Sequence, residues 1–174
     1  MSVHCVIPAR YASTRYPGKP LAMLRGATGV AQSLIERSWR AAMAVDGFDA
    51  VHVATDDDRI AEAARAFGAE VLMTSSEARN GTERCAKALA QLGEGVEMVV
   101  NLQGDAPLTP PWFLEALIEG LRADAQAAVA TPILRCDGET LAALKADRAA
   151  GRVGGTTAVV DSAMRGLYFS KEVI

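Results

Sequence analysis

Short apolar segments alternate with amphipathic ones along most of the chain, and this alternation restricts the fold class. The expected elements are strands at residues 3–8, 50–55, 69–74, 97–103 and 127–134, and helices over 28–44, 56–68, 80–93 and 109–122. The first strand, VHCVIP, is apolar nearly throughout, as expected when both faces of a parallel sheet are covered. The pattern predicts an α/β protein, a three-layer α/β/α sandwich around a doubly wound, mostly parallel sheet with right-handed crossovers.

The C-terminal part of the chain is less regular. Residues 138–155 are rich in Ala, Arg and Gly, and two short strands are expected at 156–161 and 166–170. Neither an internal repeat nor a linker interrupts the 174 residues, a length that suits one domain with a real core. We therefore expect a single domain over residues 1–174.

Composition and charge exclude several classes of protein. The net charge of −3 and the isoelectric point near 5.4 argue against a nucleic-acid binder driven by bulk electrostatics, so any positive site must be local. No apolar run approaches the ~20 residues that span a bilayer, and the first strand begins without a signal-peptide core. These features predict a cytoplasmic protein with neither a membrane nor a nucleic acid as its partner.

Cysteines and histidines are sparse. Cys5, Cys85 and Cys136 are an odd, widely spaced set without a C-x-x-C pair, which fits neither a disulfide framework nor a zinc site. We interpret all three as buried thiols in a reducing compartment. His4 and His52 are too few and too far apart in the sequence for a histidine-rich metal cage.

A basic loop follows the first strand. Arg10, Arg15 and Lys19 fall within ten residues, in a stretch with Gly and Pro and almost no acid. Three cations held this close repel one another, so we expect an anion beside them. The loop contains neither a G-x-G-x-x-G fingerprint nor a P-loop, but a lysine can act as a point charge on phosphate and an arginine can donate twice. The alternative is a solvated basic loop.

Ligands of doubly wound sheets bind at the carboxyl ends of the strands, which would gather residues 9–19, 55–58, 74–84 and 103–108 around one rim. In the stretch NLQGDAPL, Asp105 follows a buried strand on a tight turn. Mg²⁺ commonly takes one or two carboxylates and completes its shell with substrate phosphates and water. Asp105 is thus a candidate magnesium ligand, or else a turn-forming Asx residue.

The stretch RNGTERCA lies before another helix on the same rim. Asn80 and Gly81 are flanked there by Arg79 and Arg84. Thr82 or Asn80 can cap the helix, and the loop can also read a base or a ribose; the two interpretations are compatible. The three acids at 56–58 are interpreted as helix N-terminal residues alone.

Five stretches together resemble the CMP-Kdo synthetases, the 3-deoxy-manno-octulosonate cytidylyltransferases of lipopolysaccharide synthesis: IPARYASTRYPGKPL, VATDDDRIAEAARAFGAEVLMT, NGTERCAKAL, VNLQGDAPLTPP and LYFSKEVI. They follow the family's order from residue 3 to the last residue. Sialic-acid cytidylyltransferases share only a looser pattern. The resemblance implies a Rossmann-like fold of the nucleotide-diphospho-sugar transferase type. It also implies transfer of CMP from CTP to the anomeric hydroxyl of a 2-keto sugar acid, Kdo, with release of pyrophosphate.

The resemblance also implies roles for individual residues. Contacts to the triphosphate or cytidine would come from Arg10, Ser13, Arg15 and Lys19. A frame for the base and ribose would come from Arg79, Asn80, Gly81 and Gln103. Asp105 would hold Mg²⁺, the implied cofactor, and would act in catalysis with Lys19 and Arg15. The implied partners are CTP, Kdo and a second copy of the intact protein in a homodimer.

The chain departs from the family at several points. Ala78 and Asn80 stand where the family usually has His and Ser, and Ala106 replaces the Glu of QGDEP. Residues 143–155 resemble an insertion, and the sequence stops at Ile174, where family members continue. The part beyond would carry most of the sugar-acid pocket, a second Mg²⁺ carboxylate and much of the dimer contact. We therefore expect these 174 residues to be a fragment of a longer enzyme or to be inactive on their own.

Three hypotheses follow for the function. The first is a Mg²⁺-dependent cytidylyltransferase that activates Kdo. The second is a cytidylyltransferase for another acidic sugar, because Ala78 and Ala106 leave room for a different specificity. The third is a non-catalytic nucleotide-binding module, because only one carboxylate for a metal is identified.

Overall fold

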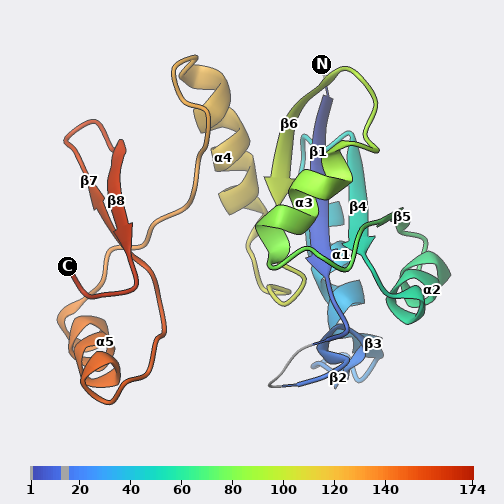
Figure 1. Ribbon diagram of the computed structural model, residues 1–174, viewed down its shortest axis with the longest axis horizontal. Coiled ribbons are helices and arrows are strands. Elements are labelled where there is room, and N and C mark those ends of the chain that lie inside the picture. Colours follow the sequence, from blue (N-terminus) through green and yellow to red (C-terminus); the bar gives the residue numbers. More distant parts are fainter. Residues whose placement is uncertain (1, 13–15) are drawn as a thin grey trace. The chain divides into compact units, whose positions relative to one another are not determined.

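The computed structural model describes residues 2–12 and 16–174 (Figure 1). The chain divides into two compact units, Met1–Ala130 and Thr131–Ile174. The prediction of a single domain over 1–174 stays a prediction. The predicted site residues Ser13 and Arg15 lie outside the described residues.

A parallel sheet forms the centre of the first unit. Its four strands are β1 (Ser2–Ala9), β4 (Ala50–Thr55), β5 (Glu70–Met73) and β6 (Val96–Asn101). They lie in the order β5-β4-β1-β6, and each neighbouring pair is parallel. The chain thus builds outward from β1 through β4 to β5 and then returns to the other side of β1. The predicted doubly wound parallel sheet is confirmed.

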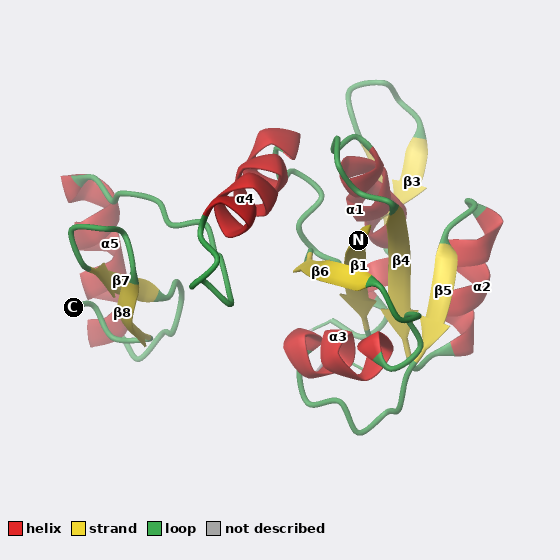
Figure 2. Ribbon diagram, turned by 90° about the horizontal axis from the view of Figure 1, so that it is seen from above, coloured by secondary structure: helices red, strands yellow, loops and turns green. Residues whose placement is uncertain are grey.

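Helices cover both faces of this sheet, with α1 and α3 on opposite sides of it in Figure 2. The helices of the first unit are α1 (Leu34–Met43), α2 (Asp58–Ala66), α3 (Gly81–Leu89) and α4 (Pro111–Ala123). Side chains of α1, α2 and α4 join one apolar cluster with Cys5 and Ile7 of β1. Side chains of α3 join another with Val6. Alternate residues of a strand point to opposite faces, so β1 supplies both layers of the sandwich.

Side-chain caps fix where three of these helices begin. Ser33, Asp57 and Asn80 each accept a hydrogen bond from a backbone N–H two or three residues later. The predicted helix over 28–44 is wrong at its start, because β3 (Ala31–Ser33) pairs antiparallel with β2 (Met23–Arg25) before Ser33 caps α1. A short 3-10 helix, η1 (Lys19–Leu21), precedes this hairpin.

Pro8 ends the pairing between β1 and the edge strand β6. The β1–β4 register runs to Ala9, whereas the β1–β6 register ends at Val6 opposite Asn101, followed by the 3.2 Å bond from Leu102 N–H to the carbonyl of Val6. Hydrogen-bonding direction alternates along a strand, so Pro8 faces the same neighbour as Val6. Since proline has no N–H, the β1–β6 ladder stops there.

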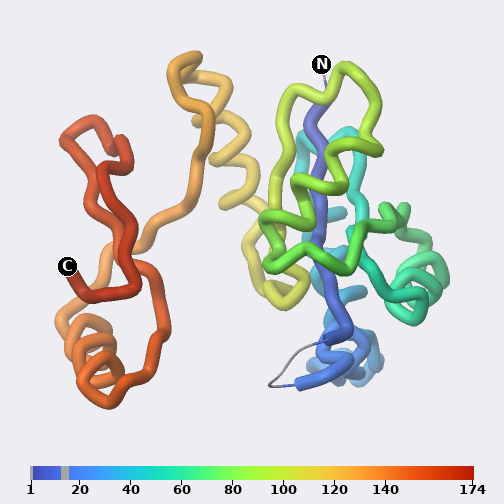
Figure 3. The backbone as a smooth tube through the Cα atoms, viewed as in Figure 1, coloured from blue at the N-terminus to red at the C-terminus, as the bar shows by residue number. Residues whose placement is uncertain are grey.

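The second unit contains α5 (Gly138–Ala149) and an antiparallel hairpin of β7 (Thr157–Val160) and β8 (Gly166–Ser170). The hairpin confirms the two short strands predicted at 156–161 and 166–170. The backbone of each unit can be followed by itself in Figure 3.

The strand predicted at 127–134 is wrong. All eight residues are described, and none lies in a strand. The N–H of Ala127 is engaged in a turn with the carbonyl of Asp124, and Pro132 has no N–H to donate. An apolar run becomes a strand only where its backbone groups meet a paired neighbour, and this segment does not meet one.

Candidate active site

A pocket opens where the strand order reverses, between the carboxyl ends of β1 and β6. Such a switch point is where open α/β sheets bind their ligands. The pocket has a volume of about 240 Å³ and is lined by the segment after β1, by η1, by the start of α3 and by the turn after β6. Six of the predicted site residues line it: Arg10, Lys19, Asn80, Gly81, Gln103 and Asp105.

Lys19 and Asp105 are in direct contact although 86 positions separate them in the sequence. The Nζ atom of Lys19 lies 2.6 Å from Oδ2 of Asp105, and the two side chains are 45% and 54% exposed. An ion pair this accessible adds little to stability. Each group can therefore give up this ion pair for a ligand. Lys19 can bind a phosphate oxygen instead of Asp105, and Asp105 can bind a cation instead of Lys19.

The turn before η1 places Lys19 at the pocket. Gly18 has a φ of 68°, a left-handed conformation that favours glycine, and its N–H donates to the carbonyl of Tyr11 at 2.9 Å. The ring of Tyr11 packs beneath Gly18 and carries the guanidinium of Arg59 3.3 Å from its centroid. The basic loop is thus anchored to α2 close to Lys19.

The turn that carries Asp105 is held from beneath. The hydroxyl of the fully buried Ser38 donates to the carbonyl of Gly104 at 2.9 Å. A Cβ atom on Gly104 would lie 2.8 Å from the carbonyl oxygen of Pro8, so only glycine fits between α1 and β1. Close backbone packing therefore sets the position of the Asp105 carboxylate.

The start of α3 forms the opposite wall. Asn80 caps the helix by accepting the N–H of Glu83 at 2.9 Å, and the carboxylate of Glu83 accepts the N–H of Arg79 at 2.8 Å. The predicted helix cap is confirmed, and the role of Asn80 in nucleotide binding stays a prediction. A Cβ on Gly81 would lie 2.7 Å from Oε1 of Gln103. The start of α3 can approach Gln103 this closely because Gly81 has no side chain.

Of the two arginines that flank Asn80 and Gly81 in the sequence, Arg84 lines the pocket and Arg79 does not. Arg79 is exposed and is not among the residues that line the pocket. Arg84, which sequence reasoning treated only as a flanking residue, lines the pocket and is 2% exposed. Its position four residues after the Asn80 cap was a usable signal, because that spacing returns the side chain to the same helix face.

A magnesium ion fits the pocket only if a bound ligand supplies some of the oxygen atoms that coordinate it. The described residues contain no group of three or more His, Cys, Asp and Glu side chains arranged to hold a metal. Asp105 alone presents a half-exposed carboxylate on the pocket wall. One carboxylate plus substrate phosphates and water is a donor set that Mg²⁺ accepts. Magnesium at Asp105 therefore stays a prediction that the donor set supports.

The cysteines take no part in this site. Burial raises the pKa of Cys5 to about 12 and that of Cys85 to about 11, so both are inert thiols at neutral pH. The interpretation of Cys136 as buried is wrong, because it is exposed in the second unit, which buries none of its residues. Every buried residue that the structure describes lies in the first unit, which contains the parallel sheet, and Cys136 lies outside that unit.

Comparisons with known proteins agree with this geometry. A family model described as Cytidylyltransferase matches residues 4–174. This chain belongs to the cytidylyltransferase family. It is 52% identical over all 174 residues to the 3-deoxy-manno-octulosonate cytidylyltransferase of Maricaulis maris, covering 65% of that protein. Its 119-residue match to the 8-amino-3,8-dideoxy-manno-octulosonate cytidylyltransferase of Shewanella woodyi is 46% identical and covers 68% of this chain and 46% of that protein.

A solved cytidylyltransferase structure shares the fold. The CMP:2-keto-3-deoxy-manno-octonic acid synthetase complexed with CTP matches 98% of this chain and 64% of its own with a TM-score of 0.81 and 33% identity. The chain therefore spans between about half and two thirds of the length of these cytidylyltransferases. Among the described residues, no helix is both long and apolar enough to cross a membrane.

Proposed function

We propose that this chain is the nucleotide-binding part of a cytidylyltransferase that transfers CMP from CTP to the anomeric hydroxyl of Kdo and releases pyrophosphate. The observation that carries the proposal is the Lys19–Asp105 pair at the switch-point pocket, at 2.6 Å. The pair brings together a cation that can bind phosphate and a carboxylate that can bind a metal ion. The names of the relatives give the substrates, and lipopolysaccharide synthesis in the cytoplasm is the proposed setting.

Each predicted site residue has a specific task in this proposal. Arg10 and Lys19 bind the triphosphate, and the hydroxyl of the sugar acid attacks the α-phosphorus as pyrophosphate leaves. Phosphoryl-type transfer depends on positioning and charge neutralisation more than on covalent help. Asp105 would hold Mg²⁺, which neutralises charge on the phosphates when bound. Asn80, Gly81 and Gln103 frame the base and ribose, while Ser13, Arg15 and Arg79 remain proposed nucleotide contacts.

The substrate test uses the intact protein, with pyrophosphate release as the readout. CTP plus Kdo with Mg²⁺ is expected to release pyrophosphate, and UTP plus Kdo is the matched control. The 8-amino-3,8-dideoxy analogue tests the second sugar acid, which the Shewanella relative favours. If CTP raises the melting temperature but neither sugar acid releases pyrophosphate, the protein is a binding module and the proposed transfer is wrong. Size determination in solution tests the proposed homodimer.

A further inference from the structure

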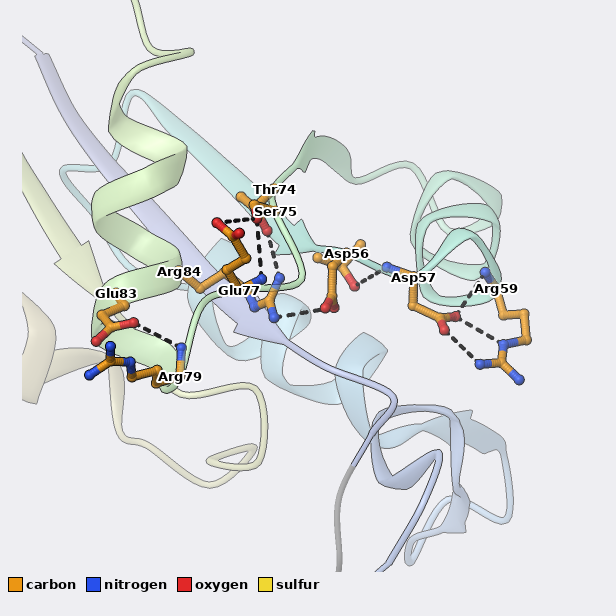
Figure 4. A network of polar contacts seen from close by, with 10 residues as sticks. Asp56, Asp57, Arg59, Thr74, Ser75, Glu77, Arg79, Glu83 and Arg84 are labelled. Carbon is orange, nitrogen blue, oxygen red and sulfur yellow. Dashed lines mark hydrogen bonds and ion pairs between the residues drawn. The ribbon is translucent and has the colours of Figure 1, made fainter.

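Arg84 is a buried cation in the wall of the pocket. It stands in the second turn of α3 and is 2% exposed, yet it lines the pocket. Its Nη2 atom lies 3.2 Å from Oδ1 of Asp56, and its Nη1 donates to the hydroxyl of Thr74 at 2.6 Å. Figure 4 shows the guanidinium reaching from α3 toward both partners.

The two partners of Arg84 stand at the ends of neighbouring strands. Asp56 directly follows β4, and Thr74 directly follows β5. The N–H of Thr74 donates to the carbonyl of Thr55 at 2.8 Å, so these strand ends are themselves joined. One guanidinium thus connects α3 to two parallel strands of the sheet at their carboxyl ends.

The same residue is tied by its backbone to the pocket wall. The N–H of Arg84 donates to the carbonyl of Asn80 at 3.1 Å, which is the hydrogen bond of the first turn of α3. Asn80 and Gly81 line the pocket at this turn. A shift of Arg84 would therefore move the wall that faces Gln103 and Lys19.

The type of interaction argues for a role beyond stability. A buried ion pair gains little over apolar side chains of similar volume, because both charges must leave water. Asp56 is also only 19% exposed, so this pair is largely desolvated. Arg84 lines the pocket and is a member of neither apolar cluster, which suits a positioning role.

We propose that Arg84 is the positioning residue that fixes the start of α3 at the nucleotide site, through Asp56 and Thr74. The proposal rests on the proposed function, since it takes CTP as the ligand of the pocket. Arg84 acts through the wall that it holds. Its loss should weaken CTP binding while leaving the reacting groups on the other wall in place.

The test compares variants of the intact protein by their kinetics and their melting temperatures. Arg84→Met removes one charge and leaves Asp56 unpaired, so it should lower the melting temperature as well as CTP affinity. The double variant Asp56→Asn with Arg84→Met removes both charges, and should recover much of the stability without restoring the link to the sheet. For both we expect the KM for CTP to rise about tenfold or more, with the KM for the sugar acid nearly unchanged.

The controls separate positioning from simple destabilisation. Arg40→Met removes the exposed arginine of the Glu36–Arg40 pair on α1, and should leave the KM for CTP unchanged. Arg84→Lys keeps a charge near Asp56 and should restore part of the CTP affinity. A loss of folded protein alone would lower kcat without changing KM, so the split between the two parameters distinguishes the roles.

Two outcomes would contradict the proposals separately. If the double variant binds CTP in calorimetry with the same Kd as the unmodified protein, Arg84 has no positioning role. If the unmodified protein itself binds no CTP, the proposed function is wrong. Should Arg84→Met fail to fold, the double variant and Arg84→Lys decide by the same measurements.

Discussion

Lys19 is the residue whose removal tests the site most directly. Its charge faces Asp105 across 2.6 Å on an exposed wall, so Lys19→Ala should leave the fold intact. If Lys19 stabilises charge that builds up on the phosphates, kcat of the intact enzyme should fall by about 100-fold or more. Steady-state kinetics and circular dichroism measure the two effects, with Arg65→Ala, an exposed cation of α2, as the control. An unaltered kcat would remove Lys19 from this role.

Asp105 gives the corresponding test for the metal. Asp105→Asn keeps the size of the side chain but removes the charge that a hard cation needs. We expect the Mg²⁺ concentration for half-maximal activity to rise by about tenfold or more. A magnesium titration of activity measures this, and Asp46→Asn, at an exposed position after α1, is the control. An unchanged titration curve would assign the metal to other ligands.

His52 gives the fold a dependence on pH. Its ring is 5% exposed, stacks on His4 with Nε2 3.0 Å from Nδ1, and approaches Glu70 at 3.1 Å through its own Nδ1. Burial lowers the pKa of His52, with a smaller contribution from His4 in the same direction, and Glu70 opposes both. The unfolded chain therefore binds a proton more readily than the folded chain.

The sign of the effect follows from this difference. The stability that neutral His52 allows is complete above the ordinary histidine pKa of about 6.5, and is lost as pH falls from there through the lower folded pKa. The free energy of unfolding from urea titrations should therefore decrease between about pH 7 and about pH 5. His52→Gln should flatten part of that decrease, with His4→Gln measured beside it. Parallel pH profiles for the native chain and His52→Gln would show that another group is responsible.

At the residue scale, the sequence predicted which side chains would lie close together, and their roles stay predictions. Arg10, Lys19 and Asp105 were found because cations and a lone acid at strand ends are unusual, and the structure brings all three to one pocket. Arg84 was overlooked because its environment depends on Asp56 and Thr74, which only the folded chain brings within 3.2 Å. Arg79 looked equivalent in sequence, yet it precedes the Asn80 cap and is exposed.

At the scale of elements, glycine shows how tightly the pieces pack. Gly104→Ala would place a Cβ 2.8 Å from the carbonyl of Pro8, a backbone atom that cannot move without shifting β1. We expect a loss of about 1–3 kcal/mol in the free energy of unfolding. Gly120→Ala in α4 is the matched control, because a Cβ there meets nothing within 4 Å and should add about 0.5–1 kcal/mol through helix propensity. Equal stability of the two variants in urea unfolding would contradict the packing argument.

The elements that sequence predicted correctly are those whose environment is set locally. Strands β1, β4, β5 and β6 are apolar and bounded by turns, and α2 and α3 begin at polar caps. The hairpin of β2 and β3 was missed because it uses few apolar residues, and α5 because its sequence lacks a firm period. The run at 127–134 has the composition of a strand, but it has no partner that could pair with it.

At the scale of the whole molecule, the core belongs to one unit. All buried apolar side chains that the structure describes lie between Val3 and Ile118. Residues 131–174, all described, include none that is buried. A fragment of residues 1–130 should therefore unfold cooperatively, with a melting temperature within about 5 °C of the 174-residue chain. Thermal melts followed by circular dichroism compare the two, and a fragment without a cooperative transition would show that residues 131–174 are needed for folding.

Pro8 also has a kinetic consequence for the pocket. Because Pro8 offers no N–H, β1 and β6 cannot extend their ladder past it at the pocket between their carboxyl ends. For the proposed nucleotide, we therefore expect entry without a prior step that breaks β1–β6 hydrogen bonds. We expect the association rate to depend on diffusion and on attraction by Arg10 and Lys19, and to decline as added salt screens those charges.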